Sequence, residues 1–374
     1  MNFSLLLLLL FILATAAQLV LWWGVFGRLA LPRGNDDGSA NAILPPCSVI
    51  ISARNEAGNL RAFLPTILEQ QYPDFEVIVV NDASSDDTAG VLLELASHYP
   101  SLLRTIHLAE KEGPGKKQAL TRGIEAARHG ILVLTDADCR PASPHWLREM
   151  TRPFERPETE IVLGYGPFTS KNTLLNRWAC YETTCTAVQY LSMALAGMPY
   201  MGVGRNLAWR KPLFRQAGGF AAHAQLASGD DDLLVNAVAR AGNTEICLRP
   251  EAFVFSEAKQ SLSAWLRQKR RHLSAGWHYR REHQVVLGAA ALTHGLHYGL
   301  ALLLFLTGFG IKYVLWGCIL RESTVWLLSA RILRRLGERR LIPWVIPFDA
   351  MMAGYYALVT GPALLLRPKD NPWK

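Results

Sequence analysis

The chain has 374 residues, half of them hydrophobic, and a net charge of +8. This length allows one large domain or two ordinary ones, and the slightly positive mean hydropathy is unusual for a soluble enzyme. The basic residues crowd the flanks of apolar segments and do not alternate with aromatic residues, which argues against a nucleic-acid partner. The six cysteines form no CxxC pair and no zinc-type spacing, so they are read as small apolar residues in a reducing compartment.

An uncharged apolar segment covers residues 5–26 and exceeds the roughly 20 residues that cross a bilayer. A cleaved signal peptide is the alternative, because residues 14–16 resemble a cleavage site. However, no positively charged stretch precedes the segment, and its apolar character continues through Trp22 and Trp23. We therefore predict an uncleaved transmembrane anchor over residues 4–27.

Short apolar runs alternate with amphipathic runs in the central region, residues 46–258. The patterns predict strands over residues 48–51, 76–80, 102–108 and 130–135, and helices over residues 56–69, 85–97 and 116–128. This alternation predicts one α/β domain with a mostly parallel sheet that helices cover on both faces. Neither a Gly-x-Gly-x-x-Gly after the first strand nor a Walker A sequence is present, which disfavours dinucleotide-binding and P-loop folds.

Polar side chains follow three of the four predicted strands. Asn55 and Glu56 follow the first strand, Asp82 follows the second, and Asp136 and Asp138 follow the fourth. Ligands of parallel sheets bind beyond the carboxyl ends of the strands, so we expect these side chains to share one site. Turn chemistry or helix capping offers a structural alternative for the first three.

The pair Asp136 and Asp138 has the chemistry of a metal site. Mg²⁺ and Mn²⁺ take oxygen ligands and often combine one or two carboxylates with substrate phosphates. Such a cation would neutralise the charge that develops on a departing nucleotide diphosphate. Two solvated carboxylates in a turn are the alternative, and the position at a strand end favours metal binding.

Two further clusters lie downstream. In the run Asp230-Asp231-Asp232, crowding of carboxylates raises pKa values and suits one of them to act as a general base, although an acidic helix N-terminus would look the same. Residues 259–283 form a basic segment next to the membrane. Its run from Gln268 to His272 could clamp a pyrophosphate or face anionic lipid headgroups.

The C-terminal region, residues 284–366, is apolar again. Residues 285–310 can span a membrane, residues 313–333 can span it despite Arg321 and Glu322, and residues 341–366 form a further span or a re-entrant piece. We predict two to four spans here. Basic flanks place the central domain on the cytoplasmic side of a multi-pass protein of the cell inner membrane.

Together these motifs resemble family 2 glycosyltransferases of the membrane-bound, processive-synthase-like branch, over residues 48–277. The resemblance implies a glycosyltransferase A-type fold, which binds a nucleotide sugar. It implies that Asp82 contacts the nucleobase, that Asp136 and Asp138 hold Mg²⁺ or Mn²⁺, and that residues 48–56, with Asn55 and Glu56, begin the nucleotide pocket. The family's Gly-Lys-x-x-Ala-Leu motif matches residues 115–120 and places Lys116 beside the nucleotide.

The same resemblance assigns the rest of the site. Residues 204–210, which include Asn206, through residues 218–220 match the segment before the base. In the family the base lies in a Glu-Asp-x-Asp-Leu pattern, which gives Asp230, with an ambiguity of one residue toward Asp231 because Gly229 replaces the glutamate. The Gln-x-x-Arg-Trp motif matches Gln268 and Arg271, but His272 stands where tryptophan is usual.

The resemblance implies inverting transfer of a sugar, with UDP as the expected nucleotide, to a lipid, lipid-linked or other glycan acceptor at the membrane face. The tryptophan lines the acceptor channel of processive synthases, so His272 weakens that reading. A processive polysaccharide synthase and a non-catalytic membrane scaffold that kept the fold remain the alternatives. Residues 178–196 are mostly apolar and suit an interfacial helix beside a lipid acceptor.

Overall fold

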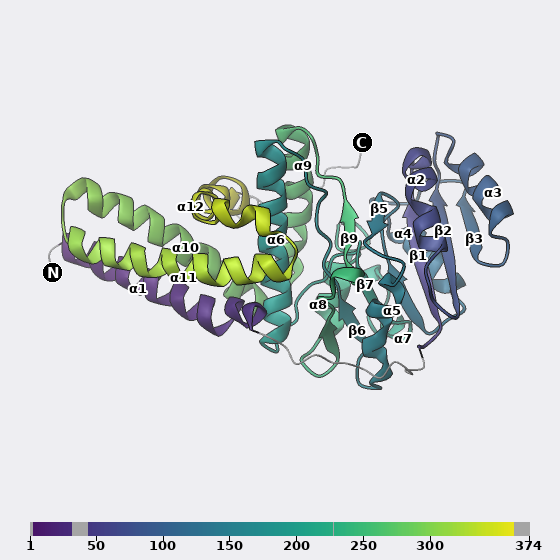
Figure 1. Cartoon of the computed structure of the whole chain (residues 1–374), viewed down its shortest axis with the longest axis horizontal. Coiled ribbons are helices and arrows are strands. Elements are labelled where there is room, and N and C mark those ends of the chain that lie inside the picture. Colours follow the sequence, from purple (N-terminus) through teal and green to yellow (C-terminus); the bar gives the residue numbers. More distant parts are fainter. Residues whose placement is uncertain (1–2, 32–43, 227, 363–374) are drawn as a thin grey trace.

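A computed structural model describes residues 3–31, 44–226 and 228–362. The molecule is elongated, with a bundle of long apolar helices at one end and an α/β domain at the other (Figure 1). Two further helices, α6 (Leu174–Leu195) and α9 (Leu262–Leu273), stand between the two parts.

The α/β domain is built on a seven-stranded sheet with the order β3-β2-β1-β4-β7-β6-β8. The strands are β1 (Cys47–Ala53), β2 (Phe75–Asp82), β3 (Leu103–Leu108), β4 (Ile131–Leu134), β6 (Ile161–Leu163), β7 (Leu207–Arg210) and β8 (Thr244–Ile246). Strands β1 to β4 run parallel to one another, and β7 runs antiparallel to both of its neighbours. This arrangement confirms the predicted mostly parallel sheet. Two short strands, β5 (Cys139–Pro141) and β9 (Val254–Ser256), pair beside it.

Helices cover both faces of the sheet, because its central strands are apolar on both sides. The helices of the domain are α2 (Ala57–Leu68), α3 (Thr88–His98), α4 (Lys117–Ala126), α5 (Trp146–Thr151), α7 (Pro212–Gln216) and α8 (Asp232–Val238). Along β1, Val49 and Ile51 pack in the same core as Leu60 of α2, whereas Ile50 packs with Leu120 of α4. Successive side chains of one strand therefore belong to two different cores.

The predicted helix over residues 85–97 begins later, at Thr88. Its expected first residues are held elsewhere: the backbone N–H of Ser85 donates to the Asn55 side chain at 2.8 Å, and the Ser84 hydroxyl accepts from the Asn55 backbone at 3.0 Å. Asp86 then accepts the backbone N–H of Thr88 at 3.0 Å. The two loops that follow β1 and β2 are thus joined to each other.

The helical bundle contains α1 (Phe3–Gly24), α10 (Arg281–Thr307), α11 (Ile311–Arg335) and α12 (Val345–Tyr355). By length and composition, three described helical segments could cross a membrane: residues 3–30, 281–307 and 339–360. Two of these candidate segments follow the α/β domain. Residues 363–366 of the predicted membrane region lie outside the described residues.

Helix α11 is not among these three because it carries charges, yet it lies alongside α1 and α10 (Figure 1). Its Arg321 has no exposed surface, forms an ion pair with Asp349 of α12 and donates to the Tyr298 hydroxyl of α10 at 3.0 Å. The 25 residues of α11 rise about 1.5 Å each, which exceeds the roughly 30 Å of a bilayer core. Its length is therefore compatible with a further span.

The bundle joins the α/β domain through an aromatic cluster. Trp178 of α6 lies 5.5 Å from Phe348 and 6.2 Å from both Trp265 of α9 and Tyr355, measured between ring centroids. Helix α6 begins four residues before the predicted interfacial segment, and many of its residues are buried between the two parts. It serves as a wall between the sheet and the bundle.

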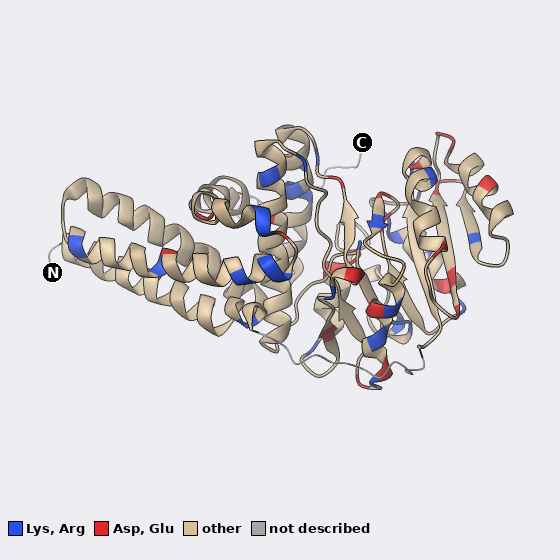
Figure 2. Ribbon diagram, viewed as in Figure 1, with Lys and Arg blue, Asp and Glu red and all other residues tan. Residues whose placement is uncertain are grey.

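Basic side chains of the bundle gather at the end nearest the α/β domain (Figure 2). They come from the end of the first helix, the start of α10, the end of α11 and the segment after it: Arg28, Arg280, Arg281, Arg331, Arg334, Arg335, Arg339 and Arg340. Lys312 lies at the opposite end, at the start of α11. The bundle is therefore electrically asymmetric along its axis.

A buried carboxylate secures the edge of the sheet opposite the ligand-binding edge. Glu76 has no exposed surface and accepts from the Ser48 hydroxyl at 2.8 Å, from the Arg128 backbone N–H at 2.6 Å and from Arg104 at 3.0 Å. We expect Glu76→Ala to lower the free energy of unfolding by about 2–3 kcal/mol, because buried donors lose their acceptor. Urea unfolding in detergent measures this. Glu94→Ala, at an exposed site, is the control, and equal losses for both variants would contradict the assignment.

Candidate active site

One cleft of about 1150 Å³ lies where the carboxyl ends of the parallel strands face α6, α8 and α9. All the predicted site residues except Asn55 and Asn206 line it: Glu56, Asp82, Lys116, Asp136, Asp138, Asp230, Asp231, Gln268 and Arg271. The structure therefore brings together side chains that are up to about two hundred residues apart in the sequence. Their roles follow from their contacts.

Lys116 lies at the centre of this cleft, at the start of α4. Its ammonium group is 2.5 Å from an Asp136 oxygen and 3.2 Å from an Asp230 oxygen. Burial opposes its charge, but the surrounding carboxylates of Asp136, Asp230 and Asp231 hold the pKa of Lys116 well above its usual value. A permanent cation thus bridges the predicted metal site and the predicted base.

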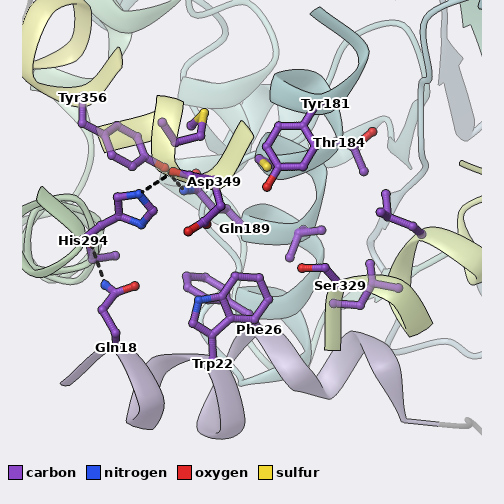
Figure 3. Close-up of a pocket in the computed structure, with 16 residues that line it drawn as sticks. Gln18, Trp22, Phe26, Tyr181, Thr184, Gln189, His294, Ser329, Asp349 and Tyr356 are labelled. Carbon is purple, nitrogen blue, oxygen red and sulfur yellow. Dashed lines mark hydrogen bonds between the residues drawn. The ribbon is translucent and has the colours of Figure 1, made fainter. Parts of the chain in front are cut away.

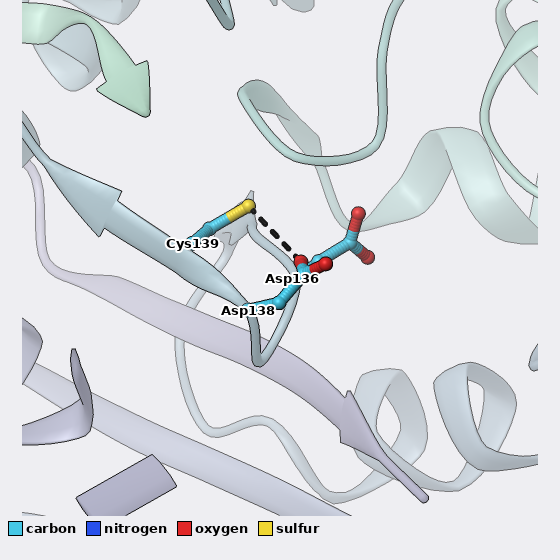
Figure 4. Close-up of side chains that lie close together, drawn as sticks. All are labelled: Asp136, Asp138 and Cys139. Carbon is cyan, nitrogen blue, oxygen red and sulfur yellow. Dashed lines mark hydrogen bonds between the residues drawn. The ribbon is translucent and has the colours of Figure 1, made fainter. Parts of the chain in front are cut away.

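Asp136, Asp138 and Cys139 follow β4 as one cluster, with possible ligand atoms within 4.8 Å of one another (Figure 4). Burial raises the pKa of the Cys139 thiol well above its usual value, so this sulfur remains protonated and is a poor ligand for a hard cation. Burial, reinforced by the charge of Asp136, also raises the pKa of Asp138. A divalent cation would relieve this repulsion, so the donor set of two carboxylates fits Mg²⁺ or Mn²⁺.

The three consecutive aspartates differ in their partners. Asp231 is the N-cap of α8 and accepts from the backbone N–H groups of Gly204 at 2.5 Å and Asp232 at 2.8 Å. Asp232 accepts from the Tyr279 hydroxyl at 2.7 Å. Asp230 instead directs its carboxylate to Lys116 inside the cleft. Asp231 and Asp232 therefore have structural partners, and Asp230 is the one placed beside the metal cluster.

The pKa values of this run reflect the same crowding. Burial, with a contribution from the Asp230 charge, raises the pKa of Asp231 to about 6. Burial, with a contribution from the Asp231 charge, raises the pKa of Asp232 to about 8. The predicted effect of adjacent carboxylates on pKa is thus present at Asp231 and Asp232.

A second lysine holds the segment that leads to Asp230. The Lys117 side chain is buried and donates to the carbonyl of Leu226 and, at 2.6 Å, to that of Ser228. The Ser228 hydroxyl donates to the Arg271 carbonyl of α9 at 3.0 Å. The start of α4 therefore contacts the Asp230 segment through both of its lysines.

Asp82 lies at the end of β2 and is almost fully buried. One carboxylate oxygen pairs with Lys111, which also donates to the Gly115 carbonyl at 2.6 Å. The other oxygen has no hydrogen-bond donor among the described residues, and Asp82 lines the cleft. This second oxygen is itself buried and unpaired beside the cleft, so it is an unused hydrogen-bond acceptor. Sequence reasoning missed Lys111, because no motif surrounds it.

The Glu56 side chain also lines the cleft, where it accepts from Asn59 at 2.6 Å. Burial and the charges of Asp138 and Asp136 raise its pKa. Its side chain makes no capping hydrogen bond at the start of α2. Asp86 accepts the first backbone N–H of this helix, from Ala57. Its carboxylate therefore faces the cleft and does not act as a helix cap.

Two predicted substrate-binding residues do not line the cleft. Asn55 has a left-handed backbone, with φ of 56°, and its side chain holds the turn that follows β2. Asn206 is fully buried, donates to the carbonyls of Tyr165 and Ala252 at 2.8 Å each, and accepts from the Trp146 indole at 3.0 Å. Both amides stabilise the walls of the site in this structure.

The basic helix α9 contributes Gln268 and Arg271 to the cleft, together with His272. Burial and neighbouring cations lower the pKa of His272 well below its usual value, so it is neutral. Lys269 forms an ion pair with Glu182 of α6, both largely buried. Glu182 was missed in the sequence, although a lone carboxylate in the apolar stretch 178–196 was a visible signal.

Arg205 is a further cleft residue that sequence reasoning left without a role. Its guanidinium lies 4.7 Å from the centroid of the Phe168 ring and donates to the Ser256 hydroxyl at 2.9 Å. Its charge acts on both Asp136 and Asp138. It lies in the segment 204–210 that carried the family resemblance, so the motif marked its position.

Comparison with known proteins agrees with this site. Residues 45–275 match the family model described as "Glycosyltransferase like family 2". The probable glycosyltransferase YdaM of Bacillus subtilis is 27% identical over 249 residues, which are 61% of this chain and 54% of that protein. A poly-beta-1,6-N-acetyl-D-glucosamine synthase of Staphylococcus epidermidis is 25% identical over 154 residues, 41% of this chain and 35% of that one.

The fold is similar over nearly its whole length to a solved structure, the mannosyltransferase PcManGT from Pyrobaculum calidifontis in complex with GDP-Man and Mn²⁺. The TM-score is 0.62 at 20% identity, and the match covers 96% of this chain and 99% of that one. The chain spans about half or less of the sequence relatives it matches.

The chain belongs to the family 2 glycosyltransferases, because the family model covers more than half of it. This result confirms the predicted family, the predicted A-type fold and the class of enzyme, a glycosyltransferase. The glycosyltransferase relatives argue against the alternative of a non-catalytic membrane scaffold that kept the fold.

The raised pKa of Asp232 predicts how stability depends on pH. The folded protein keeps this proton up to about pH 8, whereas the unfolded chain releases it near the ordinary value of 3.8, so folding takes up a proton in this range. The contribution of Asp232 to stability is therefore present below about pH 4 and lost as pH rises toward 8.

Thermal unfolding of the unaltered protein and of Asp232→Asn between pH 5 and pH 9 measures this effect. We expect the melting temperature of the unaltered protein to fall relative to that of the variant as pH rises. Two curves that stay parallel across this range would show that Asp232 titrates normally in the folded protein.

Proposed function

We propose that the protein transfers a sugar from a nucleotide-sugar donor, with UDP as the nucleotide, to a lipid or lipid-linked acceptor at the cytoplasmic face of the inner membrane, with inversion at the anomeric carbon. The observation that carries this proposal is the Lys116 bridge between Asp136 and Asp230. It supports a donor diphosphate site and a proton acceptor within one cleft.

The donor occupies the sheet edge in this proposal. The free oxygen of Asp82 accepts an N–H group of the nucleobase, as the single ring N–H of uracil would provide. Lys116 lies where it can contact the diphosphate. Asp136 and Asp138 hold Mg²⁺ or Mn²⁺, which supplies charge neutralisation to the departing diphosphate. The similar fold of PcManGT holds GDP-Man and Mn²⁺, which supports a nucleotide sugar with a cation.

Asp230 serves as the general base. Its carboxylate takes the proton of the acceptor hydroxyl, whose oxygen forms the new bond to the anomeric carbon as the bond to the diphosphate oxygen breaks. A single displacement of this kind inverts the configuration and needs no covalent intermediate on the protein. Lys116 positions Asp230, while Asp231 caps α8 and Asp232 binds Tyr279.

The bundle supports the membrane location. Three described helical segments are long and apolar enough to cross a bilayer, and their surfaces expose large apolar side chains such as Leu292, Leu306 and Leu358. The arginines at the end nearest the α/β domain favour a cytoplasmic position for that domain under the positive-inside rule.

A processive polysaccharide synthase is the second candidate, favoured by the likeness to the poly-beta-1,6-N-acetyl-D-glucosamine synthase. The two functions differ in their product. Membranes that contain the protein are incubated with radiolabelled nucleotide sugars and Mn²⁺, then extracted with organic solvent. Label in the organic phase supports the lipid transferase, and label in high-molecular-weight material supports the synthase. Absence of transfer or hydrolysis with every donor would refute both.

The metal assignment predicts that Asp138→Asn lowers the transfer rate at least about 100-fold, because a metal supplies several kcal/mol of charge stabilisation. Donor binding, measured by calorimetry with UDP, should also lose its dependence on Mn²⁺. Glu257→Gln, another cleft carboxylate that is paired with Lys171, is the control. Unchanged Mn²⁺ dependence in the Asp138 variant would refute the assignment.

The base assignment separates two neighbours. We expect Asp230→Asn to lower kcat by roughly 100- to 10,000-fold with little change in donor KM, as is typical for loss of a general base. Asp231→Asn should instead lower the melting temperature through the weakened cap of α8, with a smaller effect on kcat. The reverse ranking of the two kcat values would move the base to Asp231.

A further inference from the structure

The cleft extends beyond the residues that serve the donor and reaches the membrane helices. We call this extension the acceptor arm. Its lining comes from α6, from the start of α10 and from the last membrane segment: Glu182, Thr183, Cys185, Thr186, Gln189, Leu287, Gly288, Ala291, Met352, Tyr355, Tyr356 and Thr360. A single hollow therefore connects Asp230, on the α/β domain, with two candidate membrane spans.

The arm opens to the outside of the bundle at Gly288. This glycine lines the cleft and is exposed, and a Cβ atom added at its position would meet no atom within 4 Å. Gly288 belongs to the candidate span formed by residues 281–307, so the space outside it would be the membrane. Ala291, about one turn further along α10, also has a small side chain, so it leaves this side of the arm open.

A neighbouring cavity does not provide an alternative end for a lipid chain. It lies between α1, α6, α10, α11 and α12, with Gln18, Trp22, His294 and Asp349 around it (Figure 3). Its volume is only about 70 Å³, room for a few waters and far below the roughly 300 Å³ of a small-molecule site. The open side of the arm at Gly288 therefore suits a lipid chain better than this small cavity does.

The opposite wall of the arm is polar but carries balanced charge. Glu182, Thr186 and Gln189 recur at helical spacing on α6, so they share one face. Lys269 pairs with Glu182 at this wall, and Gln189 donates to the Tyr356 hydroxyl at 3.3 Å. The ammonium of Lys269 is therefore already neutralised, and the wall offers hydroxyl and amide groups to a ligand. Such a surface suits hydroxyl groups better than an anion.

We propose that the acceptor is a lipid with an uncharged, hydroxyl-bearing headgroup, which enters sideways from the membrane. Its headgroup lies along the polar face of α6 and presents a hydroxyl to Asp230. Its chain passes Gly288, between α10 and the last membrane segment, and stays in the bilayer. This inference rests on the proposed function and specifies its acceptor.

Filling the opening tests the route. Gly288→Leu adds a side chain at a position where the Cβ atom has open space, and Gly354→Leu is the matched control. Gly354 is also an exposed glycine of a membrane helix with open space around it, but it does not line the cleft. We expect Gly288→Leu to lower kcat/KM for the lipid acceptor by roughly 10- to 200-fold, the range by which a changed pocket shape discriminates. Gly354→Leu should transfer at the unaltered rate.

The assay uses detergent-solubilised full-length protein with a radiolabelled UDP-sugar and, in separate arms, a diacylglycerol or a polyprenyl phosphate. Mn²⁺-dependent UDP binding is measured for each variant and shows whether the donor site is intact. We expect the unaltered protein to transfer the sugar to the diacylglycerol. We expect Gly288→Leu to lose most of this transfer and to keep its Mn²⁺-dependent UDP binding.

Three results would overturn the inference while the proposed function stands. They are unaltered lipid transfer by Gly288→Leu, equal losses in both glycine variants, and preference for the polyprenyl phosphate. Failure of the unaltered protein to glycosylate any lipid would instead refute the proposed function itself, and the inference with it.

Discussion

The ion pairs of Lys116 are the constraint on which the site depends. Its ammonium group binds Asp136, at the end of β4, and Asp230, in the segment before α8, so two parts of the chain almost a hundred residues apart meet at one cation. Without this charge, the carboxylates around it would repel one another in a partly buried cleft. Lys117 strengthens the same junction from the next position of α4 by holding the Ser228 carbonyl. The start of one helix thus fixes the distance between donor and base.

The sheet could be predicted where strands are apolar and follow the helix-strand alternation, as β1, β2 and β4 do. The short strands β6, β7 and β8, each of three or four residues, were not predicted, because so few residues carry no periodicity. The late start of α3 was missed for another reason. The bonds that hold Ser84 and Ser85 come from Asn55, a residue of a different loop, so local sequence could not reveal them.

The residues of the site also divide into those that the sequence could place and those that it could not. That Asp136, Asp138 and Asp230 meet in one cleft could be predicted from the strand ends and from the order of motifs in the family resemblance. The place of Asn206 could not, because a motif does not tell whether its amide faces a ligand or the Trp146 indole inside the wall. The roles of Lys111 and Lys269 could not be predicted either, because they depend on ion pairs with Asp82 and Glu182 in other elements. The sequence does not show which charged side chains pair with one another in the folded protein.

The position of the cleft between water and membrane has an energetic consequence. Moving a lipid chain into water costs about 0.8 kcal/mol for each CH₂ group, so full extraction of a long chain would consume far more than one binding site supplies. An acceptor arm that opens at Gly288 avoids this cost, because the chain remains among apolar helices and lipid while the headgroup alone moves toward Asp230. The proposed donor is charged and water-soluble, so it needs the opposite environment, which the sheet edge would provide. In the proposed reaction, the bundle and the α/β domain would therefore each solvate one substrate, and transfer would take place where the two environments meet.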